Sequence, residues 1–127
     1  MIIYPMKTVK IIKYASPQVT ITAGVCNNFF TKFSGLMFRQ KIDPFFGLLF
    51  SEPTESRINT SIHMFFMNFD ITVLWLDKKY RIVDVALTKK WHPIYVSKAP
   101  AQYTLELHSD RFSDYSIGDQ LQVLTNE

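Results

Sequence analysis

The order of hydrophobic and polar residues along the chain predicts a mostly β protein. Residues 8–14 and 19–22 alternate between apolar and polar side chains and are rich in β-branched residues, so we expect two strands paired as a hairpin. A second hairpin is predicted from residues 71–76 and 81–88, because a polar turn sequence separates them. Further strands are expected at residues 47–50, 57–67, 103–107 and 120–124, with a polar loop at 51–55, a long loop at 91–99 and a helical turn at 110–115.

One early segment has a different period. Between residues 27 and 38 the apolar side chains fall at helical spacing on one face, and Asn27 or Asn28 can cap the first turn. About eight short strands with one early α-helix, in an order rich in hairpins, predict an antiparallel β-sandwich or a partly closed barrel. The length of 127 residues is that of an ordinary domain, so we expect residues 1–127 to form a single domain.

Composition and charge narrow the function classes only slightly. The chain is 47% hydrophobic and carries 11 phenylalanines, which suits the space between packed sheets. Its net charge of +3 is weak, and the densest basic residues, Lys78, Lys79 and Arg81, fall at a predicted turn, so we expect no nucleic-acid partner. Because no apolar run approaches the roughly 20 residues of a membrane span, and the first residues do not resemble a signal peptide, we expect a cytoplasmic protein.

Cysteine and histidine usage argues against metal and redox chemistry. Cys26 is the chain's one cysteine, so no intrachain disulfide can form, and a small buried thiol is its expected identity. The three histidines are dispersed and none has the close spacing of a metal motif. We therefore expect no metal and no cofactor.

Several short motifs, taken in order, carry a family resemblance. They are Gly35-Leu36-Met37-Phe38-Arg39, Gly47-Leu48-Leu49-Phe50, Met64, Asp77, Tyr95, Ser97, Pro100-Ala101, Tyr103, Leu105-Glu106 and Gly118-Asp119. With them, residues from about 24 to 123 resemble the family called domain of unknown function 192. The resemblance implies a compact β-sandwich with a helix inserted early, and no established activity, so it supplies no catalytic residues. The chain departs from the family at residues 63–66, where His-Met-Phe-Phe stands in place of the common Trp-Met-Lys-Asn.

The best recognition candidates are aromatic residues of the long loop. Trp91, His92 and Tyr95 can stack on a sugar ring or another flat ligand, although they can equally close the end of the core. Arg39 ends an apolar run and has two interpretations. It is either a clamp for a carboxylate or phosphate, or a structural ion pair with Glu106 or Asp119.

A catalytic alternative rests on His63. A general base needs a carboxylate behind it, and Asp70 or Glu106 could serve, although a histidine in an apolar run is commonly a core residue. Glu106, Asp119 and Asp77 are also interpreted as structural polar residues. We further expect Arg39 and Glu106 to be the charged residues whose loss most damages the fold.

Three function classes therefore stay open at the level of sequence. The first is a non-catalytic module that binds a small polar or sugar-like ligand, through Arg39, Trp91, His92 and Tyr95. The second is a hydrolase or lyase that uses a histidine–carboxylate pair. The third is a structural or interaction subunit, with a homodimer as one form, because surplus apolar surface marks interfaces. Whether the protein is an enzyme is undecided.

Overall fold

The structure, a computed structural model, describes residues 7–26 and 41–125. In these residues it contains seven strands and one short 3-10 helix. The strands are β1 (Thr8–Lys13), β2 (Thr20–Cys26), β3 (Phe46–Ser56), β4 (Ile71–Leu76), β5 (Ile82–Thr88), β6 (Ala101–His108) and β7 (Leu121–Thr125). The 3-10 helix η1 (Ser109–Asp114) follows β6 directly. The protein is thus mostly β, as its sequence pattern predicts.

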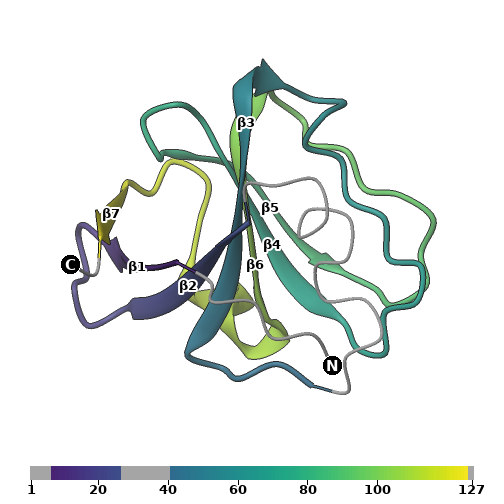
Figure 1. Ribbon diagram of the computed structural model, residues 1–127, viewed down its shortest axis with the longest axis horizontal. Helices are drawn as coiled ribbons and strands as arrows, with labels where there is room; N and C mark the ends of the chain where they lie inside the picture. The colour runs from purple at the N-terminus through teal and green to yellow at the C-terminus, as the bar shows by residue number, and fades with distance from the viewer. Residues whose placement is uncertain (1–6, 27–40, 126–127) are drawn as a thin grey trace.

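The strands form one mixed sheet in the order β5-β4-β6-β3-β2-β1-β7. Figure 1 shows β1, β2 and β7 on one side of β3, and β4 and β5 on the other. Strands β2 and β3 pair in parallel, so the prediction of a purely antiparallel arrangement is wrong. Parallel neighbours need a long crossover connection, and residues 27–45 supply it here.

The sheet is not closed, because its edge strands β5 and β7 are not paired with each other. Their first residues nevertheless approach, with one isolated bridge between Arg81 and Gln120. The Ile82 amide donates to the Asp119 carbonyl at 2.9 Å, and the Leu121 amide donates to the Tyr80 carbonyl at 3.0 Å. These bonds join the turn before β7 to the start of β5, so one corner of the sheet is held together.

Both predicted hairpins are confirmed, as β1 with β2 and as β4 with β5. Two other predictions are wrong. Residues 51–55 do not form a loop, because β3 continues to Ser56 through an irregularity in its pairing with β6. Residues 57–67 form bends and turns instead of a strand. The predicted helix at 27–38 lies outside the described residues.

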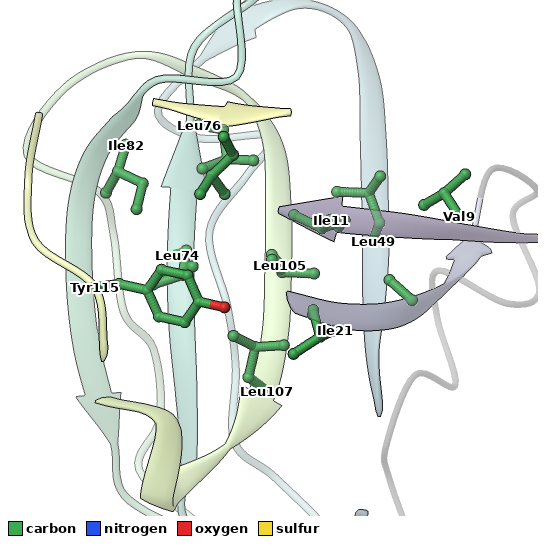
Figure 2. Close-up of a cluster of buried hydrophobic side chains, with 12 residues drawn as sticks. Val9, Ile11, Ile21, Leu49, Leu74, Leu76, Ile82, Leu105, Leu107 and Tyr115 are labelled. Carbon is green, nitrogen blue, oxygen red and sulfur yellow. The ribbon is translucent and has the colours of Figure 1, made fainter. Parts of the chain in front are cut away.

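The first core is aliphatic and draws on all seven strands. It comprises Val9, Ile11, Ile21, Ala23, Leu49, Leu74, Leu76, Ile82, Leu105, Leu107, Tyr115 and Leu121. Figure 2 shows the side chains of β1, β2 and β3 meeting those of β4 and β6, with the Tyr115 hydroxyl directed toward Leu105 and Leu107. Gly47 lets β3 and β6 pack closely, since a Cβ there would lie 2.5 Å from Cδ2 of Leu107.

The second core lies on the opposite face of the central strands and is more varied. It comprises Cys26, Ile42, Leu48, Met64, Met67, Ile71, Val73, Trp75 and Ala101. Side chains alternate between the faces of a strand, so on β4 Leu74 enters the first core while Val73 and Trp75 enter the second. Met64 and Met67 come from the segment that follows β3, so this segment covers the second face of the sheet.

Candidate ligand-binding site

Two loops that are far apart in the sequence are joined beside the second core. Residues 61–70 lie against residues 89–97 through paired backbone hydrogen bonds. The Ile62 amide donates to the Tyr95 carbonyl at 2.8 Å, and the Tyr95 amide donates back at 2.6 Å. The Trp91 amide donates to the Met64 carbonyl at 2.8 Å, while the Met64 amide donates to the His92 carbonyl at 3.1 Å. The two loops therefore act as one unit.

The loop pair is anchored to the sheet by buried and polar contacts. Met64 is fully buried, and the Thr88 hydroxyl of β5 donates to its sulfur at 3.3 Å and to the Ile71 carbonyl at 3.1 Å. The Asp70 carboxylate accepts from the Lys90 amide at 2.8 Å and lies 3.5 Å from the Lys89 ammonium. These bonds hold the second loop in place before any ligand arrives.

Aromatic rings project from this fixed loop pair into solvent. Phe66 is 44% exposed and Trp91 is 53% exposed, and their rings meet edge to face with centroids 5.3 Å apart. We call the exposed rings of Phe65, Phe66, Trp91 and His92 the aromatic platform. Solvent exposure of so much aromatic surface in one place is uncommon unless something binds to it.

The backbone beneath the platform is strained. Phe66 and Trp91 both have positive φ angles, 62° and 65°, in the left-handed region that bulky side chains disfavour. Each such residue costs on the order of 1–3 kcal/mol and persists where its surroundings over-determine it. The paired hydrogen bonds between the two loops provide that constraint. Strained, exposed and mutually contacting aromatic residues are typical of a binding site.

His92 and Tyr95 have different positions, although sequence analysis grouped them. Their rings lie 4.6 Å apart. His92 is exposed, whereas Tyr95 is half-buried against the second core, and its hydroxyl accepts from the Lys89 amide at 2.8 Å. Trp91 and His92 are therefore open to solvent, whereas Tyr95 packs toward the core.

The predicted histidine–carboxylate pair is not assembled in the described parts of the chain. His63 is exposed rather than a core residue, and its ring lies 5.9 Å from that of Phe65. Asp70 contacts Lys89 and Lys90, and neither it nor Glu106 is within hydrogen-bond distance of His63. Residues 7–26 and 41–125 likewise contain no cluster of three metal-ligating side chains.

The structural polar residues divide into satisfied and unsatisfied groups. Asp77 organises the turn after β4, accepting from the Lys79 amide at 2.8 Å and the Arg81 amide at 3.0 Å. Asp119 accepts from the Ser116 amide at 2.8 Å and lies 3.3 Å from the Lys13 ammonium. Arg39 lies outside the described residues, so its pairing with Glu106 or Asp119 stays a prediction.

Glu106 is the unsatisfied member of this set. It is 8% exposed, yet it makes no hydrogen bond or ion pair with any described residue. Desolvation by burial raises the pKa of its carboxyl to about 7, since nothing nearby compensates the charged form. Because Glu106 lies at the end of an otherwise apolar run at residues 103–107, the sequence indicated that it is drawn toward the core, but its lack of a partner could not be seen from the sequence.

Phe65 and Phe66 are the platform residues that sequence analysis missed. They sit in an apolar run that resembles a buried strand, and a run of this kind does not distinguish buried from exposed rings. The available signal is their position next to His63, where the family resemblance already showed a departure. Trp91 and His92 were named as recognition candidates because aromatic residues on a loop can stack on a flat ligand, with closure of the core as the alternative.

Comparison with known proteins places the chain in an uncharacterised class of small β proteins. Residues 11–123 match DUF192, described as "Uncharacterized ACR, COG1430". The chain belongs to this family, as its motifs predicted. Residues 7–26 and 41–125 include no helix with the length and hydrophobicity needed to cross a membrane.

The relatives are themselves uncharacterised. The UPF0127 protein TK1120 of Thermococcus kodakarensis is 44% identical over 65% of this chain, which spans half the length of that protein. The UPF0127 protein PYRAB11210 of Pyrococcus abyssi is 34% identical over 80% of this chain and 85% of its own.

Two crystal structures share the fold. Protein R01717 of Sinorhizobium meliloti superposes with a TM-score of 0.81 at 20% identity, over 97% of each chain. A protein of unknown function from Novosphingobium aromaticivorans has a TM-score of 0.73 at 14% identity, over 95% of this chain and 91% of its own. At these identities the likeness concerns the fold alone.

Proposed function

We propose that the protein is a non-catalytic module that binds a small polar, sugar-like ligand on the aromatic platform. The observation that carries this proposal is the strained, exposed pair of Phe66 and Trp91, held by hydrogen bonds between two loops. Preorganisation of this kind lowers the entropy that binding must offset.

The chemistry around the platform suits a ligand with one apolar face and a polar edge. A sugar ring presents C–H groups on one face, which pack on an aromatic ring, and hydroxyls around its rim. His92 and Lys90 are exposed beside Trp91 and can hydrogen-bond to such hydroxyls. A few polar groups around an apolar surface is the usual composition of a small-molecule site.

The test is an NMR titration with glucose, galactose, mannose, N-acetylglucosamine, cellobiose and lactose. The protein contains two indole N–H groups that report separately. That of Trp91 is on the platform, whereas that of Trp75 is buried and donates to the Thr60 carbonyl at 2.8 Å. Binding at the platform should shift the Trp91 indole signal and leave that of Trp75 in place.

Matched variants make the test specific. Trp91→Ala should weaken binding by about tenfold or more, which is roughly 1.4 kcal/mol of lost stacking. Phe112→Ala removes a comparably exposed phenylalanine from η1, away from the platform, and should leave the affinity unchanged. The proposal fails if no sugar moves the Trp91 signal, or if both variants bind as wild type does.

Self-association is the other outcome that the platform can produce. The same region carries the exposed apolar side chains Ile58, Ile94 and Val96 as well as the rings. If the Trp91 signal shifts with protein concentration and Trp91→Ala abolishes a dimer seen by sedimentation, the interaction-subunit hypothesis replaces the ligand-binding one.

A further inference from the structure

A row of polar side chains runs along the middle of the second core. On β6, Thr104, Glu106 and His108 alternate with first-core residues, and we call these three the β6 polar stripe. Strand pairing places the stripe among second-core residues. On β4, Trp75 lies opposite Thr104, Val73 opposite Glu106 and Ile71 opposite His108. On β3, Phe50 lies opposite Thr104 and Leu48 opposite Glu106. The stripe therefore has apolar neighbours on both sides.

Two members of the stripe lack partners. Thr104 is 3% exposed and Glu106 is 8% exposed, and neither side chain hydrogen-bonds to any residue that the structure describes. His108 is more exposed and its Nδ1 atom is already used, because it accepts from the Asp110 amide at 3.0 Å. The oxygens of Thr104 and Glu106 are not sealed from solvent, because among the described residues the fully buried side-chain oxygen without a partner is the Tyr115 hydroxyl. A small polar ligand could therefore replace the water that reaches them.

Asp84 shows how the same sheet treats a buried carboxylate that serves the fold. It lies on β5 opposite Trp75, also facing the second core. Its two oxygens accept from the Val85 and Lys98 amides, each at 2.9 Å. Glu106 has no comparable donors, so a structural role like that of Asp84 does not explain it.

We infer that the β6 polar stripe binds a primary ammonium group carried on a short apolar body. An ammonium has three donors and no acceptor. The stripe offers three acceptors, the two Glu106 oxygens and the Thr104 hydroxyl, two residues apart on one face of β6. The positive charge would satisfy the carboxylate, and the apolar body would pack on Leu48 and Val73, which flank Glu106.

Entry of such a ligand would require side chains of the second core to repack around it. Met64 and Met67 pack in the same cluster as Val73, and methionine side chains are unbranched and repack readily. The site is separate from the aromatic platform, whose rings point to solvent, and it does not depend on the function proposed above.

The ionisable groups that face the stripe set the direction of its pH dependence. They are His108 on β6, Asp84 on β5, Glu52 near the irregularity of β3 and Cys26 on β2. Above neutral pH Glu106 is charged and attracts a cation. Below it Glu106 gains a proton and loses its charge, so cation binding weakens at low pH.

The experiment uses n-butylammonium chloride as the probe and 1-butanol as its neutral counterpart, titrated into the full chain and followed by NMR of the β4 and β6 amides. Butylammonium should bind at about pH 8, and butanol should not. Because the pKa of Glu106 is about 7, the ionised fraction of its carboxyl falls roughly thirtyfold between about pH 8 and about pH 5.5. Butylammonium should therefore bind roughly thirtyfold more weakly at about pH 5.5 than at about pH 8. Cation binding should in turn lower the pKa of Glu106.

Variants separate the stripe from its surroundings. Glu106→Gln should abolish butylammonium binding and its pH dependence, and Thr104→Val should weaken it about threefold to tenfold. Glu55→Gln changes an exposed carboxyl outside the second core and should bind within about twofold of wild type. Trp91→Ala should have no effect, which keeps this outcome distinct from the fate of the platform.

Three results would overturn the inference. The first is no saturable butylammonium binding by the wild-type protein at about pH 8. The second is equal binding of butylammonium and butanol, which would indicate an apolar cavity without a cation site. The third is equal affinity in wild type and Glu106→Gln. The wild-type pH series needs no variant, so the test stands even if one variant folds poorly.

Discussion

The two cores on either side of the sheet are built on different principles. The first core is aliphatic, takes residues from every strand and contains one polar group without a partner, the Tyr115 hydroxyl, among the described residues. The second contains two methionines, a cysteine and a tryptophan, with the β6 polar stripe beside them and the strained aromatic platform at its border. The first core is thus mainly a stabilising one, with the Tyr115 hydroxyl as an exception, and the second has more features that stability does not require.

This difference indicates where function lies. Natural folds depart from consistent local rules mainly at functional sites. Tyr80, with a positive φ of 64°, and Tyr115, with an unsatisfied hydroxyl, are departures beside the first core, and further ones lie beside the second. Phe66 and Trp91 depart in backbone conformation, and Thr104 and Glu106 depart in hydrogen bonding. The predictions that follow test whether the two cores differ in this way.

The largest effect is expected in the first core. Leu105→Ala removes a fully buried side chain from the centre of the aliphatic cluster and should lower the free energy of unfolding by about 2–5 kcal/mol. Phe65→Ala, on the platform, removes a larger but exposed side chain and should cost less than about 1 kcal/mol. Urea denaturation of the two variants gives the comparison. Similar losses of unfolding free energy would contradict the difference described between the first core and the platform.

The next effect concerns Glu106 and pH. Its carboxyl has an ordinary pKa of 4.5 when unfolded and about 7 when folded. Between these values the folded protein keeps a proton that the unfolded chain has released, so stability falls as pH rises through this window. The free energy of unfolding of wild type relative to Glu106→Gln should fall by on the order of 3 kcal/mol from about pH 4.5 to pH 8.

The control for this measurement is Glu55→Gln, which changes an exposed carboxyl. Its difference from wild type should vary by less than about 1 kcal/mol over the same range. The expectation for Glu106→Gln is the reverse of the prediction from sequence that loss of Glu106 damages the fold. That prediction assumed that Glu106 is part of an ion pair, and Glu106 has no ion pair with the described residues. A stability difference independent of pH would show that Glu106 is solvated or paired.

A smaller effect should come from the unsatisfied hydroxyl of the first core. Burial raises the pKa of Tyr115 to about 12, and its oxygen has no partner among the described residues. Tyr115→Phe should therefore raise the unfolding free energy by about 1 kcal/mol. Tyr95→Phe is the matched control, since the Tyr95 hydroxyl accepts from the Lys89 amide at 2.8 Å, and it should lower stability by a similar amount. Destabilisation by both would mean that Tyr115 has a partner.

The smallest effect is expected at the strained position Trp91. Trp91→Gly removes an exposed ring but also relieves the positive φ angle, so the two contributions oppose each other. For Trp91→Gly, urea denaturation should show a change in the free energy of unfolding of less than about 1 kcal/mol. Trp91→Ala, which keeps the strain, should be the less stable of the two variants. Equal stability of the glycine and alanine variants would show that the left-handed conformation carries no strain.

Local features of the fold could be predicted from the sequence and distant ones could not. The hairpins of β1–β2 and β4–β5 follow from alternation and from turn residues such as Asp77, which act over a few positions. The length of β3 depends on its pairing with β6, which lies far along the chain. The run at residues 57–67 resembled a strand because it is rich in bulky side chains. The sequence does not show that some of these side chains are buried and others exposed.

The candidate sites show the same limit. Trp91 and His92 could be named as candidates because aromatic residues on a loop can stack on a ligand, whereas the contact between Trp91 and Phe66 needs the pairing of two distant loops. Glu106 could be expected near the core from its position at the end of an apolar run. Its missing partner is a property of the surrounding strands β3 and β4, which no local pattern records.

The most direct test of the account is the titration of Glu106 itself, followed through its side-chain carboxyl carbon by NMR. If the second core keeps an unpartnered carboxyl in readiness for a ligand, Glu106 should titrate with a pKa of about 7 in the free protein. A midpoint close to the ordinary 4.5 would mean that water or another group already satisfies the carboxylate. In that case the two cores would not differ in the way described.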